Sequence, residues 1–346
     1  MLHTDEIVVD YEYKKNVFSE LAAEYARKTW KNREERPSAN TPANSDGVGT
    51  KTDVADRMYK FDTIGWDLIA MLADDAVRTG ATPKYVTNVL DMRKCSEEVV
   101  RQLFEGISQA AVYAGVEIIN GETEESGNQI RGYSRNAFIW SGTVINGQER
   151  KAIDEKKIRA GASIIALHEK GLRSNGFTLA RKILEKKYGT EWHNARFEDK
   201  LWGDILLKPS TIYTPAILDI LESYSLKGIA HITGGGIPEK LGRLLEPTGL
   251  SAVVDKPFSP PEPVKELQKL GEVPDEKAYE EWNMGQGMLL VCNKRNTEGI
   301  INIVKKHNVE SKVVGEVTRT KDVPTIRITS QGYFSNGRTI AYKMAV

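Results

Sequence analysis

The chain has 346 residues, which is enough for two domains that each bury a core of their own. Lys and Arg together number 48, as do Asp and Glu, and the resulting formal net charge of +0 argues against a nucleic acid or an anionic membrane as the main partner. No apolar run approaches the roughly 20 residues of a membrane-spanning helix, and the first residues are acidic where a secretory signal would be basic and then apolar. The composition therefore indicates a cytoplasmic enzyme or binding protein.

The first half of the chain alternates helix and strand patterns. Apolar residues at helical spacing predict helices over residues 15–33 and 62–77, the second capped by Asp62. Between them, residues 34–47 are rich in Pro, Asn and Ser, and we expect an exposed loop. We further expect strands at 84–90, 116–119 and 138–145, the second ending abruptly at Asn120, and a helix from Ser96 to residue 113. This alternation predicts an α/β or α+β fold.

The second half begins after a charged stretch at residues 153–161. We place the domain boundary there and divide the chain into domains of residues 1–155 and 156–346. In the second domain we expect a strand at 163–167, helices at 176–188 and 215–222, a helix that opens at Ile237, a strand–helix–strand unit at 287–292, 297–307 and 312–317, and a hairpin around Asn336-Gly337. The strand–helix–strand unit gives this domain an α/β character as well.

Residues 44–51, NSDGVGTK, contain the ingredients of a phosphate-binding loop. They do not form a Walker P-loop, because Thr50 separates Gly49 from Lys51 and Asp46 leads the run. An acidic residue at the front of such a loop can hold a metal ion that in turn holds phosphates. The motif therefore indicates a nucleotide held through metal as well as through backbone amides and a lysine.

Acidic residues gather near strand and helix ends of the first domain: Asp46, Asp62, Asp74, Asp75, Glu122 and Glu124. Carboxylates suit Mg²⁺, which binds a few of them and shares its other positions with water and phosphate oxygens. Taken one at a time, the same acids are ordinary helix caps and solvated turns. The two cysteines, Cys95 and Cys292, and the five histidines match no metal spacing, which argues against a zinc site and favours reduced structural thiols.

Three glycine-flanked turns of the second domain are further candidates: Ser174-Asn175-Gly176, the TGGGIPE segment at 233–239, and the NMGQG segment at 283–287. The triple glycine exposes successive amides before a helix whose first turn contains Pro238, an arrangement that could bind phosphate. Alone, each of the three is as readily a tight structural turn.

Taken in order, seven segments strongly resemble phosphoribosylformylglycinamidine cyclo-ligase, the aminoimidazole ribonucleotide synthetase family of purine biosynthesis. They are NSDGVGTK, FDTIGWDLIAMLADDAVRTGATP, IINGETEES, GLRSNGFTLARKIL, KPSTIY, HITGGGIPEK and WNMGQGM, and the likeness extends from Ser45 to Val317. The resemblance implies that formylglycinamidine ribonucleotide and ATP give aminoimidazole ribonucleotide, ADP and phosphate. It also implies a homodimer whose core is the N-terminal sheet, with ATP along the interface, and an α/β C-terminal domain.

The resemblance implies roles for individual residues. Lys51, Asp75 and Glu122 are expected to carry catalysis, and Asp46, Asp75 and Glu122 to hold Mg²⁺. The expected ATP-binding residues are Asp46, Gly47, Gly49, Thr50, Lys51, Asp62 and Asp75. The expected substrate-binding residues are Arg173, Ser174, Asn175, Gly234, Gly235, Gly236, Asn283 and Gly285.

Several departures mark the chain as a divergent member of the family. Arg173 stands where histidine is usual, and DYEYKKNVFSEL replaces a glycine-containing segment near the N-terminus. An arginine could add phosphate affinity or signal a changed substrate. The alternatives are a non-catalytic ATP-binding relative and another ATP-dependent enzyme of the superfamily, such as thiamine-monophosphate kinase, selenophosphate synthetase, the hydrogenase-maturation protein or the amidotransferase of the preceding purine step. The retained set of Asp46, Lys51, Asp75 and Glu122 argues against a relic.

Overall fold

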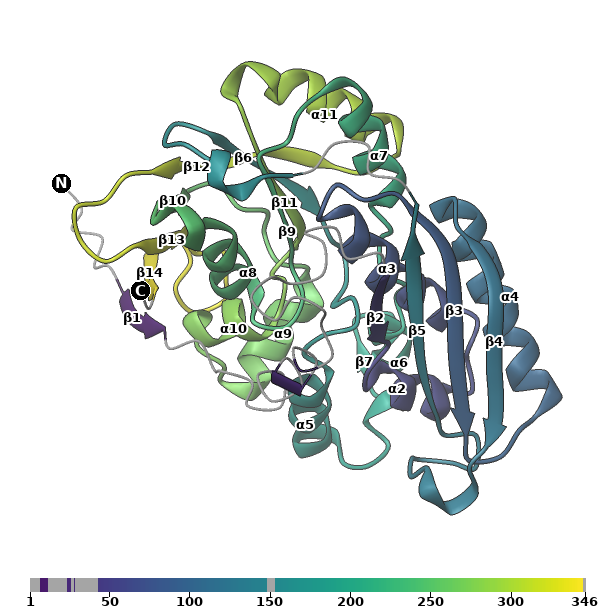
Figure 1. The fold of residues 1–346 in the computed structure, drawn as a ribbon. Coiled ribbons are helices and arrows are strands. Elements are labelled where there is room, and N and C mark those ends of the chain that lie inside the picture. Colours follow the sequence, from purple (N-terminus) through teal and green to yellow (C-terminus); the bar gives the residue numbers. More distant parts are fainter. Residues whose placement is uncertain (1–6, 12–23, 26–27, 29–42, 148–152, 345–346) are drawn as a thin grey trace.

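The computed structural model describes residues 7–11, 24, 25, 28, 43–147 and 153–344. Within these ranges, two sheets with their own helices account for most of the chain (Figure 1). The helix expected over residues 15–33 lies mostly outside the described residues, although Glu24, Tyr25 and Lys28 are helical. None of the described helices combines the length and the apolar character needed to cross a membrane.

The first sheet has four strands. Their order is β2 (Ala43–Gly47), β5 (Phe138–Asn146), β3 (Pro83–Met92) and β4 (Glu117–Glu125), with β3 and β4 parallel and the other pairs antiparallel. Buried and more exposed residues alternate along β3 and β5. Because successive side chains of a strand point to opposite faces, this sheet has one covered face and one open face.

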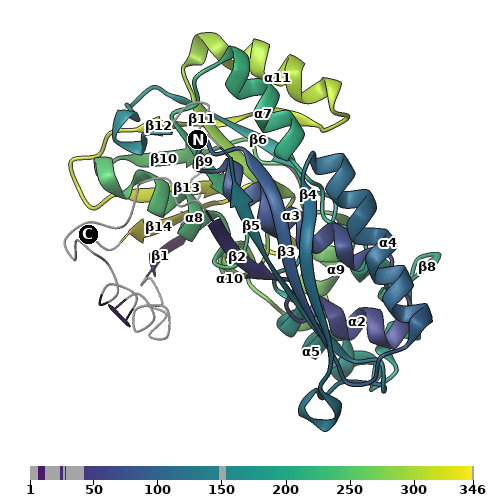
Figure 2. The ribbon, with the colours of Figure 1, turned by 45° about the vertical axis from the view of Figure 1, so that its right-hand side comes forward.

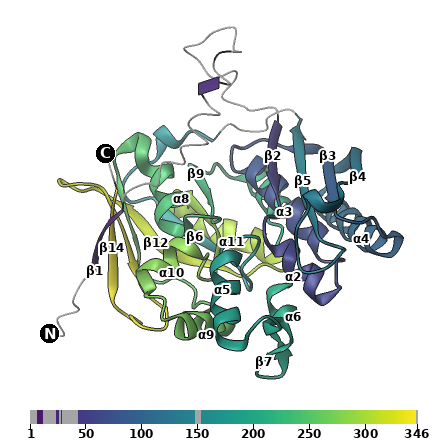
Figure 3. The same cartoon turned by 90° about the horizontal axis from the view of Figure 1, so that it is seen from below.

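Helices α3 (Ile64–Val77) and α4 (Glu97–Ala114) cover one face of this sheet, and α2 (Lys51–Met58) precedes them (Figure 2). Glycines let the two helices approach closely, because a Cβ on Gly65 would lie 2.1 Å from the backbone nitrogen of Ile107. No described helix covers the other face (Figure 3), on which Val89 and Ile139 are 43% and 56% exposed. This open face, on which Val89 and Ile139 lie among polar residues such as Ser141 and Glu122, is available for a further contact.

Three details predicted for this half are wrong. Residues 43–47 form β2 instead of a loop, because pairing with β5, with Ser45 opposite Thr143, satisfies the backbone of a segment with turn composition. The strand expected to end at Asn120 continues to Glu125 after an irregularity in its pairing with β3. Asp62 does not cap α3, whose N-cap position is Thr63. The predicted helices and strands at α3, α4, β3 and β5 are confirmed.

The second sheet has eight strands. Their order is β1 (Ile7–Tyr11), β14 (Thr339–Met344), β13 (Thr325–Thr329), β10 (Ser251–Val254), β12 (Ser311–Thr318), β6 (Ser163–His168), β11 (Gln286–Cys292) and β9 (Gly228–His231). Strand β1 runs parallel to β14, so a segment from before the first sheet completes the edge of the second. The short strands β7 (Arg196–Phe197) and β8 (Lys200–Leu201) form a separate pair.

Helices cover both faces of the second sheet (Figure 1). Ile165 and Leu290 belong to one core, together with residues of α7 (Thr214–Ser223) and α11 (Thr297–Lys306). Their neighbours Ile164 and Leu289 belong to the larger core on the other face. The helices that contribute to that core are α5 (Phe177–Tyr188), α6 (Trp202–Leu206), α8 (Gly236–Leu245), α9 (Glu262–Gly271) and α10 (Asp275–Glu281). Burial on both faces explains why β6 and β11 are continuous apolar runs.

The elements predicted in the second half are confirmed, with ends shifted by one or two residues. The hairpin is confirmed as well: β13 and β14 are antiparallel, with Thr329 opposite Thr339, and Gly337 turns the chain with a φ of +83°. Cys95 and Cys292 are free thiols, as expected. The two-domain α/β class is therefore the observed one, while the exact domain boundary stays a prediction.

Residues 208–214, which we call the junction segment, connect the two domains through buried hydrogen bonds. The carbonyl oxygen of Lys208 accepts from Nζ of Lys51 in α2 at 2.6 Å. Backbone N–H groups of Tyr213 and Thr214 donate to Oδ1 of Asp74 in α3, each at 2.9 Å. These bonds fix the C-terminal end of α3, and with it the adjacent Asp75, against the second domain.

Candidate active site

Three of the predicted segments meet between the two domains. Strand β2 ends at Gly47, and Gly49 then turns the chain with a φ of +70°. A Cβ on Gly49 would lie 3.7 Å from the carbonyl oxygen of Ser174, and one on Gly234 would lie 3.6 Å from Oδ1 of Asn175. The phosphate-loop candidate (residues 46–51), the serine turn (174–176) and the glycine turn (233–236) therefore lie side by side.

Asp46 and Asp75 interact at the edge of this meeting point. Burial raises the pKa of Asp46, the N–H of Gly47 that donates to Oδ1 at 2.7 Å opposes the shift, and the charge of Asp75 reinforces it. Burial also acts to raise the pKa of Asp75, but the hydrogen bond from His231 and the positive charges of Arg78 and Lys240 act in the opposite direction, and this pKa is lowered from its ordinary value. Asp75 is therefore an ionised carboxylate, and the pair offers the hard oxygen ligands that Mg²⁺ prefers.

A polar cavity of about 220 Å³ opens beside Asp75. Its polar lining consists of Asp75, Arg78, Glu155, His231, Thr233, Lys240 and Arg243. The positive charges of Arg78 and Lys240 act on Asp75 and contribute to its low pKa. Sequence reasoning missed His231, Lys240 and Arg78, and the available signal was the position of His231 at the end of an apolar strand directly before the glycine turn.

Arg173 does not line this site, contrary to its expected contact with substrate. Its side chain is fully buried, and Nη1 donates to Oε2 of Glu169 at 3.0 Å and to the carbonyl oxygen of Thr211 at 2.7 Å. Nη2 lies 2.9 Å from both Oδ2 of Asp74 and Nε2 of His231. The guanidinium is therefore a buried link between α3 and the second domain, and all these contacts are within the chain.

Lys51 is also turned away from the loop that it ends. Its ammonium group lies 2.7 Å from Oδ2 of Asp67, and neither side chain is exposed. Asp67 in turn accepts a hydrogen bond from the N–H of Ser210 in the junction segment at 3.0 Å. In this arrangement Lys51 fixes the start of α2, and its charge is already neutralised.

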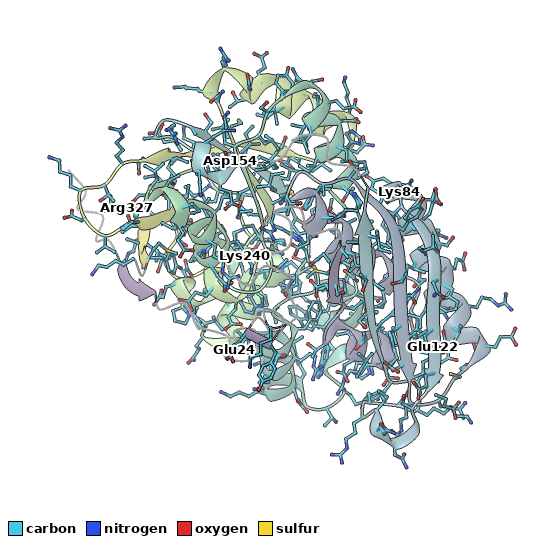
Figure 4. The ribbon with its side chains drawn as sticks, viewed as in Figure 1. Glu24, Lys84, Glu122, Asp154, Lys240 and Arg327 are labelled. Atoms are coloured by element: carbon cyan, nitrogen blue, oxygen red, sulfur yellow. The ribbon has the colours of Figure 1, made fainter. Side chains whose placement is uncertain are left out.

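The structure does not bring Glu122 or Asp62 to the Asp46–Asp75 pair. Glu122 pairs with Val89 on the open face, whereas Asp46 pairs with Gly142 in the register that faces α3. The two strands are separated by three inter-strand spacings, or about 14 Å. Figure 4 shows Glu122 on the outer strand, well away from Lys240. Asp62 precedes α3 while Asp75 lies near its end, about 20 Å apart at the rise of a helix.

The remaining predicted residues shape the turns around the site. The side chain of Asn283 donates to the carbonyl oxygen of Gly171 at 2.8 Å and accepts from the N–H of Gly285 at 2.9 Å, which ties this turn to the chain before the serine turn. Gly236 has a φ of +59°, and a Cβ there would lie 1.8 Å from the carbonyl oxygen of Tyr279. Gly235, with a φ of +87°, is the N-cap of α8. The positive φ values at both positions, and the lack of space for a side chain at Gly236, therefore require glycine here.

Within the described residues, neither a metal-binding cluster nor a further cavity of about 750 Å³ coincides with the predicted site residues. Among the described residues, no group of three or more His, Cys, Asp or Glu side chains is placed to hold a metal ion. The cavity of about 750 Å³ is lined by residues such as Lys60, Phe197, Lys208 and Pro261 and by none of the predicted site residues. The site is therefore identified by the three converging turns and the carboxylate pair.

Comparisons with known proteins agree with this organisation. The family models for the N-terminal and C-terminal domains of AIR synthase related proteins match residues 37–145 and 159–326. The chain is 38% identical over 293 residues to phosphoribosylformylglycinamidine cyclo-ligase of Thermococcus kodakarensis, covering 83% of this chain and 81% of the relative. It is 35% identical over 280 residues to the cyclo-ligase of Acetivibrio thermocellus, covering 80% and 81%.

Solved structures share the fold at much lower identity. HypE of E. coli has a TM-score of 0.61 at 18% identity and covers 95% of this chain and 98% of its own. Thiamine-monophosphate kinase of Stenotrophomonas maltophilia has a TM-score of 0.57 at 13% identity, with coverages of 93% and 98%. PurL of T. maritima complexed with ATP has a TM-score of 0.54 at 17% identity, covering 83% of this chain and 41% of its own. These likenesses concern the fold alone.

Proposed function

The chain belongs to the phosphoribosylformylglycinamidine cyclo-ligase family, and we propose that it converts formylglycinamidine ribonucleotide and ATP to aminoimidazole ribonucleotide, ADP and phosphate in purine biosynthesis. The observation that carries this function is the meeting of the phosphate-loop candidate, the serine turn and the glycine turn beside Asp46 and Asp75. The reaction needs the ATP phosphates and the ribonucleotide side by side in a fixed orientation. Its use of ATP and a phosphorylated metabolite makes the cytoplasm the proposed location.

We assign the ATP phosphates to Asp46, Gly47, Gly49 and Thr50. Gly49 and Thr50 are exposed, and a hollow of about 370 Å³ on the open face, lined by Ser45, Thr87 and Ser141, offers room for the nucleoside across the edge strand β2. Mg²⁺ fits Asp46 and Asp75, because it takes one or two protein carboxylates together with phosphate oxygens, and when bound it neutralises charge on the transferred phosphoryl group. Lys51, held by Asp67, is proposed to fix α2 behind the loop.

We assign the ribonucleotide to the serine and glycine turns. The backbone amides at Gly234 and Gly235 precede α8 and suit a phosphate group, whereas the N–H of Gly236, the first residue of α8, already donates to the carbonyl oxygen of Thr233 at 3.0 Å. In the reaction, the formyl oxygen takes the γ-phosphoryl group of ATP, an amidine nitrogen attacks the formyl carbon, and phosphate leaves with that oxygen. The two turns orient the formyl oxygen toward the loop, while Asn283 and Gly285 hold the serine turn from behind.

We also propose that the open face of the first sheet forms a homodimer. Ile119, Val89 and Ile139 are 53%, 43% and 56% exposed on this sheet, which carries no described helix over that face. Exposed apolar side chains on a sheet face that no described helix covers are typical of a protein interface. Glu122 lies on the same face, so binding of a second copy would place it in the dimer interface. There it could contribute to the proposed ATP site.

The test is an assay of the purified chain with synthetic formylglycinamidine ribonucleotide, ATP and Mg²⁺. We expect aminoimidazole ribonucleotide and ADP to form in equal amounts, and the Asp75→Asn variant to lose this activity. A parallel reaction with thiamine monophosphate in place of the ribonucleotide tests the kinase alternative. If the unmodified chain forms no more product than the Asp75→Asn variant, the cyclo-ligase function is wrong; ATP binding without product would favour the non-catalytic relative.

A further inference from the structure

The buried guanidinium of Arg173 contacts a histidine that in turn contacts the ionised carboxylate of the site. Nη2 of Arg173 lies 2.9 Å from Nε2 of His231, and Nδ1 of the same imidazole lies 2.9 Å from Oδ1 of Asp75. The side chains of Arg173 and His231 are both fully buried, whereas that of Asp75 is 27% exposed. The three residues form a chain from the core to the wall of the polar cavity.

The direction of these hydrogen bonds follows from the chemistry of arginine. A guanidinium has only donors, so Nε2 of His231 must accept and carries no hydrogen. The proton of the neutral imidazole therefore lies on Nδ1, which donates to Oδ1 of Asp75. Arg173 itself is held in place by Asp74, Glu169 and Thr211, so its Nη2 cannot turn away without breaking other buried bonds.

The bond from His231 orients the carboxylate of Asp75. Oδ1 is taken by His231, with Arg78 at 3.7 Å from the same atom. Oδ2 has no hydrogen-bond or ion-pair partner within the part of the chain that the structure describes. One carboxylate oxygen is thus anchored and the other is left for a ligand.

We propose that Arg173 is a positioning residue that fixes the tautomer of His231 and thereby aims Asp75 into the active site. A histidine at position 173 has two ring nitrogens and could not reach the four acceptors that the guanidinium contacts. The single side chain of Arg173 therefore contacts both the junction segment, at Thr211, and His231 beside the site. The consequence for catalysis rests on the proposed function, whereas the tautomer of His231 does not.

The first test is nuclear magnetic resonance on the full-length chain labelled with ¹⁵N-histidine, with the His231 signals assigned by their absence in His231→Gln. Long-range ¹H–¹⁵N correlations distinguish a proton on Nδ1 from one on Nε2. We expect a proton on Nδ1 alone in the unmodified protein. A proton on Nε2, or on both nitrogens, would overturn the proposal without any need for an Arg173 variant to fold.

The second test compares Arg173→Gln and Arg173→Lys with a matched control. Arg173→Gln should give a mixture of His231 tautomers. It should also weaken the affinity for Mg²⁺, measured in the presence of nucleotide, by roughly ten- to hundredfold, as for other residues that orient a metal ligand. Arg173→Lys, which keeps a cationic donor, should recover part of the effect. The control is Asp275→Asn, which disturbs a fully buried polar network that binds Gln268 and Phe334. It should lower stability and leave the His231 spectrum unchanged.

A double-mutant cycle separates positioning from general destabilisation. If Arg173 acts through Asp75, the variant Arg173→Gln/Asp75→Asn should bind the Mg²⁺–nucleotide no more weakly than Asp75→Asn alone. Fully additive losses would contradict the proposal. If the cyclo-ligase reaction is not observed, the expected tautomer of His231 and the expected result of the nucleotide-binding cycle do not change. The proposed function and the positioning role of Arg173 can therefore fail separately.

Discussion

Nζ of Lys51 lies 2.7 Å from Oδ2 of Asp67, and both side chains have no exposed surface. Burial lowers the pKa of Lys51 and raises the pKa of Asp67, and the attraction between the two charges opposes both shifts. Ser210 of the junction segment donates a further bond to Asp67. A lysine that the motif assigns to phosphate thus belongs to a buried ion pair at the domain junction.

We predict that Asp67→Asn lowers the free energy of unfolding by about 3–5 kcal/mol, because it leaves the Lys51 charge buried without its partner. Urea-induced unfolding followed by circular dichroism measures this. The control is Asp204→Asn, which removes a pair with Lys60 at 3.7 Å in which both side chains are nearly half exposed. That variant should change stability by less than about 1 kcal/mol. Equal effects of the two substitutions would contradict a structural role for Lys51 and Asp67.

The turn that carries Ser174 and Asn175 depends on a glycine. Gly176 has a φ of +76°, and a Cβ there would lie 2.2 Å from Cδ1 of Trp282. Trp282 is held in place, since its Nε1 donates to the carbonyl oxygen of Gly176 at 3.2 Å. We predict that Gly176→Ala costs about 2–4 kcal/mol of stability, from backbone strain and overpacking together, and raises the KM for the ribonucleotide.

The matched control for this glycine is Gly115, which ends α4. Its φ is +73°, and a Cβ there would meet no atom within 4 Å. Gly115→Ala should therefore cost only the backbone term, about 1 kcal/mol, and leave the KM unchanged. Thermal unfolding and steady-state kinetics of both variants measure the difference. Indistinguishable KM values for the two would show that the serine turn does not contact substrate.

Local periodicity made most helices and strands predictable from the sequence. It did not predict on which face of a sheet a given side chain lies. The pattern of α3 is a property of consecutive residues, so its helix could be predicted without tertiary information. Strand β2 could not, because ANSDG has turn composition and becomes a strand only by pairing with β5. Placing Glu122 required knowing that β4 continues beyond Asn120 and in which register it pairs with β3.

The site shows the same limit. The turns at residues 46–50, 174–176 and 233–236 could be located from the sequence because each carries its own turn chemistry, and the structure places them side by side; that they form one site stays a prediction. A motif does not say whether a charged side chain points to the ligand or to the core. Lys51 is paired with buried Asp67 of α3, and Arg173 with buried Asp74 of α3 as well as with its near neighbour Glu169; the pairings with α3 could not be read from spacing in the sequence.

The open face of the first sheet gives a prediction about assembly. The unmodified chain should have twice its mass of 38.6 kDa in solution, and Ile139→Glu should shift it toward the monomer, because a charge in an apolar interface is costly. Val112→Glu is the control, since Val112 is 79% exposed on α4, over the other face. Light scattering after size-exclusion chromatography measures both masses. A dimer that persists in Ile139→Glu would place the interface elsewhere.

Two histidines should make the stability depend on pH. Burial lowers the pKa of His168, which stacks on Phe258 at 4.4 Å, and it also lowers the pKa of His193. Glu310, 3.2 Å from Nδ1 of His168, and Glu191 oppose these shifts without reversing them. Below the unfolded-state pKa of 6.5, the unfolded chain therefore binds more protons at these two positions than the folded chain does.

Because both folded-state pKa values are lowered, this contribution to stability is fully present above the unfolded-state pKa of 6.5 and is lost as the pH falls through the lowered folded-state values. We predict that His168→Gln/His193→Gln flattens this part of the stability profile, because glutamine does not titrate and the unfolded state no longer gains those protons. Urea midpoints at half-unit pH steps measure the two slopes. Each single variant should remove part of the slope, since the two residues lie on separate elements and titrate independently. Parallel profiles for the unmodified and doubly substituted proteins would show that neither histidine is held neutral by the fold.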